Sequence, residues 1–378
     1  MKIGFDGKRA ANNLTGLGNY SRSLIAELAR QFPQNQYFVY TPKVKNHPQI
    51  SRFLEDQHLK ISLPDSAMPL WRSFGIQKQL QKDGIALFHG LSHEIPLGIR
   101  KTGISSVVTI HDLIFLKFPA YFGWIDRMIY KLKAQYACSH ADRIIAISEC
   151  TKRDIIEFFH TDPDKIEVVY QSCDDSFKAA PDLVWNEQVR QKHSLPERYI
   201  LSVGTIETRK NLLSLIKALP AIPGSHQLVV VGRKTGYMKL VIKELHRLNL
   251  SHRVTFLESV PFRDLPPIYQ MAEVFAYPSF YEGFGIPIIE ALYSNVPVIA
   301  ARGSCLEEAG GPSSLYVEPS DHEGLAAGIN AIIGNSELRD RMKADGTSYV
   351  KRFENSVITN QMMAIYERLL SVKNNEHA

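Results

Sequence analysis

Cysteine is scarce in this chain and never closely spaced. The four cysteines form no C-x-x-C pair, which excludes a small disulfide-rich scaffold and favours a reducing compartment. The sequence also contains no run of about 18 apolar residues, the length that a membrane-spanning helix needs, and no apolar stretch follows its start, MKIGFDGKRA. We therefore expect a cytoplasmic protein without a signal peptide or a membrane-spanning helix.

Excess charge of either sign is also small. The chain has 44 Lys and Arg against 39 Asp and Glu, a formal charge of +5. Residues 1–175 hold 22 Lys and Arg and 18 Asp and Glu, so most of the excess lies in the first half. A nucleic-acid-binding protein would show a concentrated basic stripe, so we exclude nucleic acid as a partner. The mild excess suits an anionic substrate or an anionic membrane surface.

Short apolar runs alternate with amphipathic segments along all 378 residues, a length that predicts two or three domains of about 150 residues each. The runs are continuous, as in SVVTI and IIAI, which indicates strands buried on both faces of a parallel sheet in an α/β fold. The strands predicted in the first half span residues 2–6, 36–40, 85–88, 106–110, 143–147 and 167–170.

The alternation restarts after an interruption. Residues 174–198 lack an apolar run, which predicts an interdomain linker. A second series of strands is expected at residues 199–203, 227–231, 253–257, 274–277, 296–300 and 315–317. We thus predict two Rossmann-like domains with parallel sheets: residues 1–173, completed by a C-terminal helix in residues 355–378, and residues 199–354. In such sheets ligands bind beyond the carboxyl ends of the strands.

Two loops contain residues suited to phosphate. In TGLGNY, Gly16 and Gly18 precede a predicted helix whose N-terminal N–H groups could approach a phosphate, although a flexible loop with a helix cap explains them equally well. Arg209 and Lys210 lie where another helix is expected to begin. Cations oppose the dipole there, so we interpret the pair as holding an anion such as a diphosphate; the alternative is a solvated surface pair.

The most specific pattern is PSFYEGFGIPIIEA, residues 278–291. Gly283 and Gly285 let the backbone pass close to a ligand, and Pro287 suits the first turn of a helix. Glu282 lies in the loop and Glu290 about one turn into the helix, so both carboxylates are predicted to accept hydrogen bonds from the hydroxyls of one ribose or hexose. The alternative is two surface glutamates at a helix start.

Several motifs in order resemble those of retaining glycosyltransferases of glycosyltransferase family 4, in its mannosyltransferase-like branch. YEGFGIPIIEAL carries the E-x7-E pattern, and VGTIETRKNL, TGLGNY, TIHDLIFL, IAISECTKRDI and SCLEEAGGPSSLYVEP are similar to further elements of that family. The resemblance covers nearly the whole chain. It implies a GT-B fold, in which two Rossmann-like domains with parallel sheets face each other across a cleft.

The resemblance also implies roles for single residues. Glu290 would bind the donor ribose and Glu282 the donor sugar, while Arg209 and Lys210 would neutralise the diphosphate. The catalytic residues implied are His111, Arg209, Lys210 and Glu282; the donor-binding residues are Gly16, Gly18, Gly204, Thr205, Gly283, Phe284, Gly285 and Glu290; and Asn19, Tyr20 and Asp112 are candidates on the acceptor side. The chain departs from the family at Thr205 and Asn19, where relatives often have Arg, and at Glu307, where they usually have Pro.

The implied reaction moves a hexosyl group, with retention, from a nucleotide diphosphate sugar to a hydroxyl of a glycan or lipid-linked glycan. GDP-mannose is the first donor expected and a deoxyhexose donor the next. Aspartate-rich metal motifs are scarce, so we expect no metal and no cofactor. The alternatives are a nucleotide-sugar epimerase, which needs no acceptor; a glycosidase, which needs no diphosphate site; and a non-catalytic nucleotide-sugar-binding module.

Two further features allow alternative interpretations. His89 and His93 bracket a strand end and could line an acceptor site or serve the structure alone, whereas the family pattern favours function for His111. Residues 121–133 (YFGWIDRMIYKLK) are aromatic and basic on a helical pattern. Such a segment can lie on an anionic membrane surface, but packing of Trp124, Met128 and Leu132 onto the sheet is the interpretation that we favour from sequence.

Overall fold

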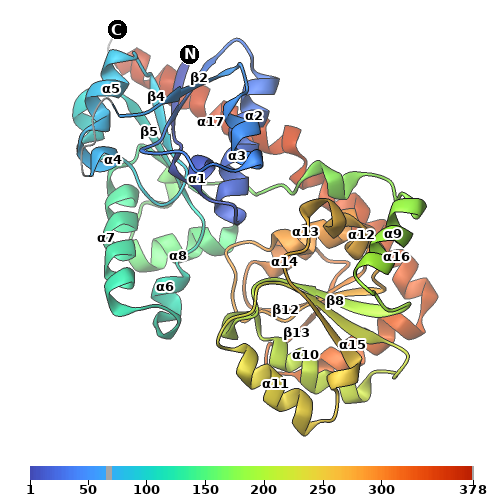
Figure 1. Ribbon diagram of the computed structural model, residues 1–378. Helices are drawn as coiled ribbons and strands as arrows, with labels where there is room; N and C mark the ends of the chain where they lie inside the picture. The colour runs from blue at the N-terminus through green and yellow to red at the C-terminus, as the bar shows by residue number, and fades with distance from the viewer. Residues whose placement is uncertain (65–69, 377–378) are drawn as a thin grey trace. The chain divides into compact units, whose positions relative to one another are not determined.

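A computed structural model describes residues 1–64 and 70–376 of the chain. The chain divides into two compact units (Figure 1). Unit 1 comprises Met1–Gln171 and Asn355–Ala378, and unit 2 comprises Ser172–Glu354. Residues 377 and 378 of the predicted C-terminal helix segment lie outside the described residues.

Unit 1 is built on a seven-stranded parallel sheet in the order β3-β2-β1-β4-β5-β6-β7. The interior strand β5 is buried at all six positions, as its unbroken apolar run predicts. The strands are β1 (Lys2–Asp6), β2 (Gln36–Tyr40), β3 (Leu59–Ser62), β4 (Leu87–Gly90), β5 (Ser105–Ile110), β6 (Arg143–Ala146) and β7 (Ile166–Val168).

Helices cover this sheet, and the C-terminal helix is one of them. Apolar residues of α17 share one core with those of α2 and of strands β1 and β2, and α17 lies beside α2 (Figure 1). The helices of unit 1 are α1 (Lys8–Asn12), α2 (Gly16–Gln31), α3 (Pro48–Leu54), α4 (Trp71–Phe74), α5 (Ile76–Lys82), α6 (Ile114–Lys117), α7 (Trp124–His140), α8 (Glu149–Phe159) and α17 (Asn355–Glu376), with 3-10 turns η1 (Ile99–Thr102), η2 (Pro119–Tyr121) and η3 (Pro163–Lys165).

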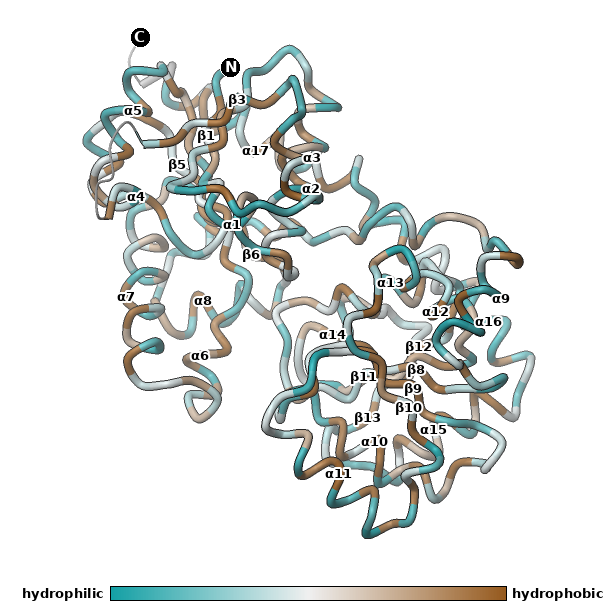
Figure 2. Tube along the Cα trace, in the orientation of Figure 1, coloured by the Kyte–Doolittle hydropathy of each residue, from teal (hydrophilic) through white to brown (hydrophobic). Residues whose placement is uncertain are grey.

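Unit 2 has a six-stranded parallel sheet in the order β10-β9-β8-β11-β12-β13. Its strands are β8 (Tyr199–Val203), β9 (Gln227–Val231), β10 (Val254–Leu257), β11 (Val274–Tyr277), β12 (Val298–Ala301) and β13 (Leu315–Val317). The hydropathy-coloured trace shows hydrophobic segments along these strands (Figure 2). In both units the strand order reverses between the first strand and the fourth, so ligand sites are expected at that switch point.

Three helices of unit 2, α9, α15 and α16, begin at a side chain that caps the first turn. Asp182, Asp321 and Asn335 each accept a hydrogen bond from a backbone N–H of the first turn, which satisfies groups that a helix leaves unpaired. The helices are α9 (Leu183–Lys192), α10 (Leu212–Ala218), α11 (Met238–Arg247), α12 (Leu265–Gln270), α13 (Ile286–Tyr293), α14 (Leu306–Gly310), α15 (His322–Gly334) and α16 (Ser336–Val350), with 3-10 turns η4 (Asp175–Lys178), η5 (Thr208–Lys210), η6 (Leu219–Ala221), η7 (Ser251–Arg253), η8 (Phe262–Asp264) and η9 (Lys351–Phe353).

The segment 174–198, predicted as a linker, is part of unit 2 in the structure. It contains η4 and the helix α9, which packs on α12. Val189 is fully buried, and Lys192 and His193 both reach the buried carboxylate of Asp264, at 2.6 and 2.8 Å. These tertiary contacts, rather than an apolar run, attach the segment to the second sheet.

Helix α7 exposes its large apolar residues. Trp124, Met128 and Leu132 are exposed, at 65, 42 and 60%, so the prediction that they pack onto the sheet is wrong. The helix is attached through small residues instead: those of its residues that are buried, and that pack in the core with β5 and β6, are Ala134, Ala137 and Cys138. No helix of the described residues is long and apolar enough to cross a membrane.

Candidate active site

Two loops of unit 2 meet because the strands before them are neighbours. Strands β8 and β11 pair directly, so the loops at their carboxyl ends share one edge of the sheet. The backbone N–H of Phe280 donates to the carbonyl of Arg209 at 2.9 Å, and the amide of Asn211 donates to the carbonyl of Pro278 at 3.0 Å. The sequence motifs around Lys210 and Glu282 are thereby fixed against each other.

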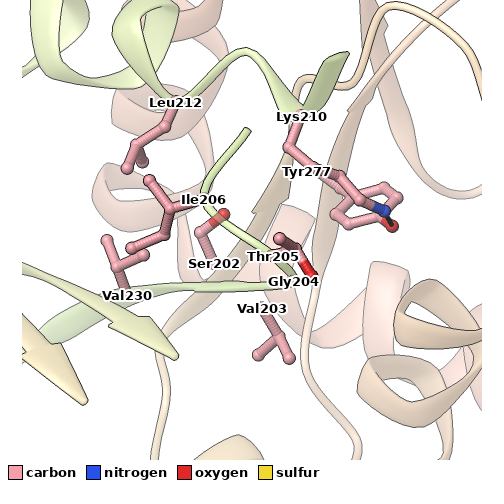
Figure 3. Close-up of a pocket in the computed structure, with 9 residues that line it drawn as sticks. All are labelled: Ser202, Val203, Gly204, Thr205, Ile206, Lys210, Leu212, Val230 and Tyr277. Atoms are coloured by element: carbon pink, nitrogen blue, oxygen red, sulfur yellow. Dashed lines mark hydrogen bonds between the residues drawn. The ribbon is translucent and has the colours of Figure 1, made fainter. Parts of the chain in front are cut away.

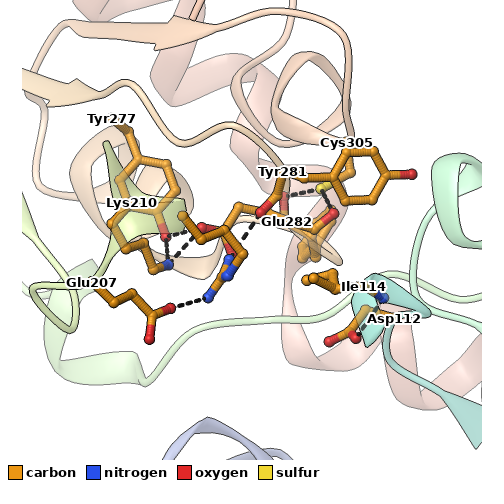
Figure 4. A network of polar contacts seen from close by, with 10 residues as sticks. Asp112, Ile114, Glu207, Lys210, Tyr277, Tyr281, Glu282 and Cys305 are labelled. Carbon is orange, nitrogen blue, oxygen red and sulfur yellow. Dashed lines mark hydrogen bonds and ion pairs between the residues drawn. The ribbon is translucent and has the colours of Figure 1, made fainter. Parts of the chain in front are cut away.

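A charged cluster forms where these loops meet (Figure 4). The Glu282 carboxylate lies 2.5 Å from the guanidinium of Arg209 and 2.6 Å from Nζ of Lys210. Lys210 also donates to the Tyr277 hydroxyl at 2.5 Å, and Arg209 pairs with Glu207 at 2.8 Å. The cluster is formally neutral, because each of its two cations is matched by one of its two carboxylates.

Burial and pairing set the ionisation of this cluster. Burial alone would raise the pKa of Glu282, but Lys210 and then Arg209 outweigh it and hold that pKa at about 2. Burial lowers the pKa of the Lys210 ammonium, and Glu282 opposes that shift. Burial would also lower the pKa of Arg209, yet the Glu282 carboxylate raises it. The carboxylate therefore keeps its charge throughout the physiological range.

A pocket opens beside this cluster at the end of β8 (Figure 3). Gly204 has a φ of +147°, a backbone conformation that favours glycine, and a Cβ added there would lie 3.3 Å from the Lys210 side chain, which would have to shift slightly. The pocket is lined by Ser202, Val203, Gly204, Thr205, Ile206, Lys210, Leu212, Val230 and Tyr277. The structure thus brings the predicted donor-binding residues Gly204 and Thr205 to the predicted catalytic Lys210.

A buried cysteine contacts the backbone of the loop that contains Glu282. Cys305 is fully buried, and its Sγ lies 3.1 Å from the carbonyl oxygen of Glu282 and 2.7 Å from that of Phe284. The Phe284 ring is buried against Phe353, so the side chain belongs to the core. Gly285 has a φ of +129°, a conformation that favours glycine. Gly283, between them, is half-buried in the same loop.

Glu290 lies in a different environment from Glu282. It sits on α13, and its carboxylate accepts a hydrogen bond of 2.7 Å from the Tyr269 hydroxyl. Burial raises the pKa of Glu290 to about 7, with Tyr269 lowering it and Asp174 raising it. The two glutamates of the E-x7-E pattern therefore differ in partners and in ionisation.

The glycine loop of unit 1 forms the start of α2. Gly18 packs on the backbone of Asn13, where an added Cβ would lie 1.9 Å from the carbonyl oxygen. Arg22 fixes this loop by donating to the carbonyls of Ala10 and Asn13 and to the side chain of Asn19. Gly16 has open space around it. Asn19, a predicted acceptor-side residue, thus contributes its Oδ1 to the loop itself.

The predicted catalytic histidine of unit 1 is enclosed in a neutral cluster. His111 Nε2 donates to the carbonyl of Leu91 at 2.8 Å, since a carbonyl can only accept. Its Nδ1 lies 3.1 Å from the amide nitrogen of Gln171 and therefore accepts. The Tyr20 ring meets the imidazole edge-on at 4.8 Å. Tyr20, predicted on the acceptor side, and His111 thus lie together, with both imidazole nitrogens occupied.

The neighbouring histidines are also neutral. His93 has a φ of +61° and accepts the backbone N–H of His111 at 2.8 Å, while His89 lies 2.6 Å from the Tyr366 hydroxyl and 2.8 Å from Thr109. Burial lowers the pKa of His89 and His111 to about 3 and that of His93 to about 4. Nearby positive charge lowers these pKa values further: that of His111 acts on His89, that of Arg9 on His93, and that of His93 on His111. The three imidazoles hold the strand ends by hydrogen bonds.

Other polar groups of unit 1 were not singled out in the sequence. Arg72 on α4 pairs with Asp6, the last residue of β1, and lies 3.4 Å from Glu94. The position of Asp6 at the end of a strand could have marked it as a candidate, but its partner Arg72 lies 66 positions further along the chain.

Asp112, a predicted acceptor-side residue, accepts the backbone N–H of Ile114 at 3.2 Å. Within the described part of the chain, no group of three or more His, Cys, Asp or Glu side chains is placed to hold a metal ion.

Two family profiles match the chain, one over each unit. The profile described as "Glycosyltransferase Family 4" matches residues 14–177, and "Glycosyl transferases group 1" matches residues 185–349. The O-antigen chain mannosyltransferase RfbU of Salmonella typhimurium is 30% identical over 69% of this chain and 68% of its own length. The chain belongs to glycosyltransferase family 4. O-antigen chain mannosyltransferase B of Escherichia coli is 28% identical over 98% of this chain and all of that protein.

Solved structures share the same fold. HepE of Anabaena, crystallised with UDP and glucose, superposes with a TM-score of 0.76 at 18% identity over 97% of this chain and all of that one. WaaG, a glycosyltransferase involved in lipopolysaccharide biosynthesis, gives a TM-score of 0.69 at 16% identity over 97% and 99%. The predicted GT-B fold, with two Rossmann-like domains, is confirmed, and the chain is a glycosyltransferase.

Proposed function

We propose that this glycosyltransferase moves a mannosyl group from GDP-mannose to a hydroxyl of a lipid-linked glycan, with retention, in the synthesis of a surface polysaccharide such as O-antigen. Two relatives, which match 98% and 69% of this chain, are named O-antigen chain mannosyltransferases. The structural neighbour HepE was crystallised with UDP and glucose, which supports a nucleotide sugar as donor.

The observation that carries the proposal is the contact of Arg209 and Lys210 with Glu282. Two half-buried cations converge on one buried carboxylate at 2.5 and 2.6 Å beside a pocket. A diphosphate offers the same cations oxygen acceptors of higher charge. We infer that the diphosphate replaces the carboxylate as their partner and frees Glu282 to accept hydroxyl hydrogens from the donor sugar.

The chemical step then follows from charge. The bond from the anomeric carbon to the phosphate oxygen breaks, and negative charge grows on the diphosphate while the sugar gains oxocarbenium character. Once the diphosphate has replaced Glu282 as their partner, Arg209 and Lys210 lie beside that charge, so they stabilise the transition state without further reorganisation. The bond from the anomeric carbon to the acceptor oxygen forms on the same face, and the departing phosphate takes the acceptor's proton. The products are GDP and the glycoside.

The other residues bind and orient the donor in this proposal. Glu290 accepts hydrogen bonds from the two ribose hydroxyls when its carboxylate is ionised. Gly204 and Thr205 present backbone groups to the phosphates in the pocket. In unit 1, Gly18 brings the N-terminus of α2 close to the donor phosphate. His111 contacts the donor sugar or its phosphate through its ring edge, because both ring nitrogens and its backbone N–H already have partners.

An epimerase with two Rossmann-like domains remains the second candidate from sequence, and no contact among the described residues favours it. An acceptor separates the two functions, because an epimerase converts the donor alone. We expect GDP release from GDP-mannose to require a lipid-linked glycan, and the product to be an α-mannoside, the anomer that retention gives. Release of free mannose or conversion of the donor without acceptor would contradict the transferase assignment, and a β-linked product would contradict retention.

A further inference from the structure

Tyr277, the last residue of β11, lies in the charged cluster without carrying a charge itself. Its hydroxyl oxygen accepts a hydrogen bond of 2.5 Å from Nζ of Lys210, because an ammonium group can only donate. The same hydroxyl donates to Oε1 of Glu282 at 3.3 Å, and that oxygen also accepts from Lys210 at 2.6 Å. The three side chains therefore form a closed triangle of hydrogen bonds (Figure 4).

The two partners of Lys210 in this triangle are held in different ways. The Tyr277 side chain is buried, and its ring stacks on that of Phe275 at 5.7 Å with an angle of 23° between the planes. Strand β11 lies inside the sheet, between β8 and β12, so strand and ring together fix the position of the hydroxyl. Glu282 instead lies in the loop that follows the strand, where its carboxylate can turn to another partner.

This difference matters when the donor binds. In the proposed function, the diphosphate replaces Glu282 as the partner of Lys210, so the lysine keeps only one of the two oxygens that it contacts among the described residues. A lysine side chain is a compact charge on a flexible stem, and it loses its orientation unless a fixed group holds it. The Tyr277 hydroxyl is such a group, and the ammonium still has donors left for the diphosphate.

The hydroxyl is also suited to this task by its charge. Burial, and then the Glu282 carboxylate, raises the pKa of Tyr277 well above its usual value, so the phenol stays protonated and neutral. A neutral oxygen can hold the ammonium of Lys210 without repelling a diphosphate. A second carboxylate at the same place would compete with the diphosphate for the lysine and would repel it.

We propose that Tyr277 is a positioning residue, whose hydroxyl holds Nζ of Lys210 toward the diphosphate after Glu282 has been displaced. Tyr277 acts through the lysine and makes no contact with the reacting atoms. The inference rests on the proposed function of Lys210 and adds a residue that sequence reasoning did not single out. The alternative is a purely structural tyrosine, whose ring fills the core and whose hydroxyl only satisfies its neighbours.

The test is a double-mutant cycle on the full chain, with Tyr277→Phe, Lys210→Ala and the combined variant, in which GDP and GMP affinities are measured by isothermal titration calorimetry. Tyr277→Phe keeps the ring and removes the hydroxyl. It should weaken GDP binding by about threefold to tenfold, the range of coupling between groups in direct contact, and leave GMP binding nearly unchanged. In the Lys210→Ala background the same change should alter GDP affinity by less than about twofold, because no ammonium is left to hold.

The matched control is Tyr199→Phe. Tyr199 lies on the neighbouring strand β8 and is fully buried, and its hydroxyl donates to the carbonyl of Ile268 at 2.6 Å. This variant also loses one hydrogen bond of a buried tyrosine, so its unfolding midpoint should fall, but it should bind GDP like the wild type. Thermal unfolding of every variant shows that each is folded at the temperature of the titration.

The outcomes separate the role of Tyr277 from the role of Lys210. An equal loss of GDP affinity from Tyr277→Phe with and without Lys210 would overturn the proposal, because the tyrosine would then act through the fold. Unchanged GDP affinity in Tyr277→Phe would overturn it as well, provided that Lys210→Ala binds GDP more weakly than the wild type. If Lys210→Ala itself binds GDP like the wild type, the proposed function of the lysine fails. A wild type that binds UDP and not GDP contradicts the proposed donor alone, and the same cycle then tests Tyr277 with UDP and UMP.

Discussion

The two units contain polar clusters at the carboxyl edges of their sheets, and the clusters work by opposite means. In unit 2, Arg209 and Lys210 converge on an ionised Glu282, whose pKa lies at about 2. In unit 1, His89, His93 and His111 are buried and neutral, with pKa values of about 3 to 4. Charge is concentrated where a charged leaving group is expected, and neutral hydrogen bonding holds the remaining groups in place.

The largest effect should come from removing the lysine of the charged cluster. Lys210→Ala leaves Glu282 with Arg209 as partner, so the fold should persist while turnover falls by roughly 10²–10³-fold, the usual cost of removing one group that stabilises developing negative charge. Steady-state transfer to acceptor measures this loss. Lys234→Ala, a lysine on the next strand-end loop that pairs with the exposed Glu258, serves as control and should stay near wild type. Full activity of Lys210→Ala would refute the role.

Neutralising the carboxylate should change how stability depends on pH. The pKa of Glu282 is about 2 in the folded protein against a usual 4.5, so the carboxylate stabilises the fold above pH 4.5 and loses that contribution as pH falls toward 2. The shift corresponds to about 3 kcal/mol at most. Denaturant unfolding between pH 2.5 and 5 should show a shallower slope in Glu282→Gln than in the wild type. Parallel slopes would show that the ion pairs do not stabilise unit 2.

The histidine cluster should give the opposite result, an absence of titration. Because the pKa of His111 is about 3, its ring stays neutral from pH 5 to 8. Removing its hydrogen bond in His111→Phe leaves the Leu91 carbonyl unpaired, which should cost about 1–3 kcal/mol of stability. The pH profile of kcat/KM should have the same shape in both proteins. A step near pH 6.5 that disappears in the variant would contradict the neutral cluster.

A smaller effect is expected at Glu290. Its pKa is about 7, so the ionised fraction rises about tenfold between pH 6 and 8. If the ionised carboxylate binds the ribose, GDP affinity measured by calorimetry should rise by up to that factor in the wild type and stay flat in Glu290→Gln. Glu244→Gln, a change at an exposed ion pair on α11, should leave the pH dependence intact. A flat wild-type profile would remove Glu290 from ribose binding.

Much of the fold follows from the sequence because both sheets are parallel and buried. Twelve strands were predicted from continuous apolar runs, and each overlaps a strand of the structure. Strand β3 was missed because it is a short edge strand with the sequence LKIS. Its apolar residues alternate with the exposed Lys60 and with Ser62, so they form no continuous apolar run. Segment 174–198 was assigned to a linker because its contacts to α12 and Asp264 are tertiary and leave no periodic pattern.

The sequence motifs predicted which residues belong to the candidate site, but not which of them contact one another. Motifs placed Arg209, Lys210 and Glu282 at strand ends, and the sheet order brings them together. Nothing in the sequence indicates that Glu282 forms ion pairs with both Arg209 and Lys210. Nor does it indicate that Cys305 contacts two carbonyls of the loop. The partners of the His111 ring were likewise invisible, because Gln171 lies 60 positions away.

The most direct test compares GDP with GMP as ligands of the wild type and of Lys210→Ala by isothermal titration calorimetry. If the cations of unit 2 hold the diphosphate, the wild type should bind GDP on the order of tenfold or more tightly than GMP, since charge-assisted hydrogen bonds are worth about 1.5–3 kcal/mol. That preference should largely vanish in Lys210→Ala, while GMP affinity changes little. An undiminished preference for GDP in Lys210→Ala would contradict the account.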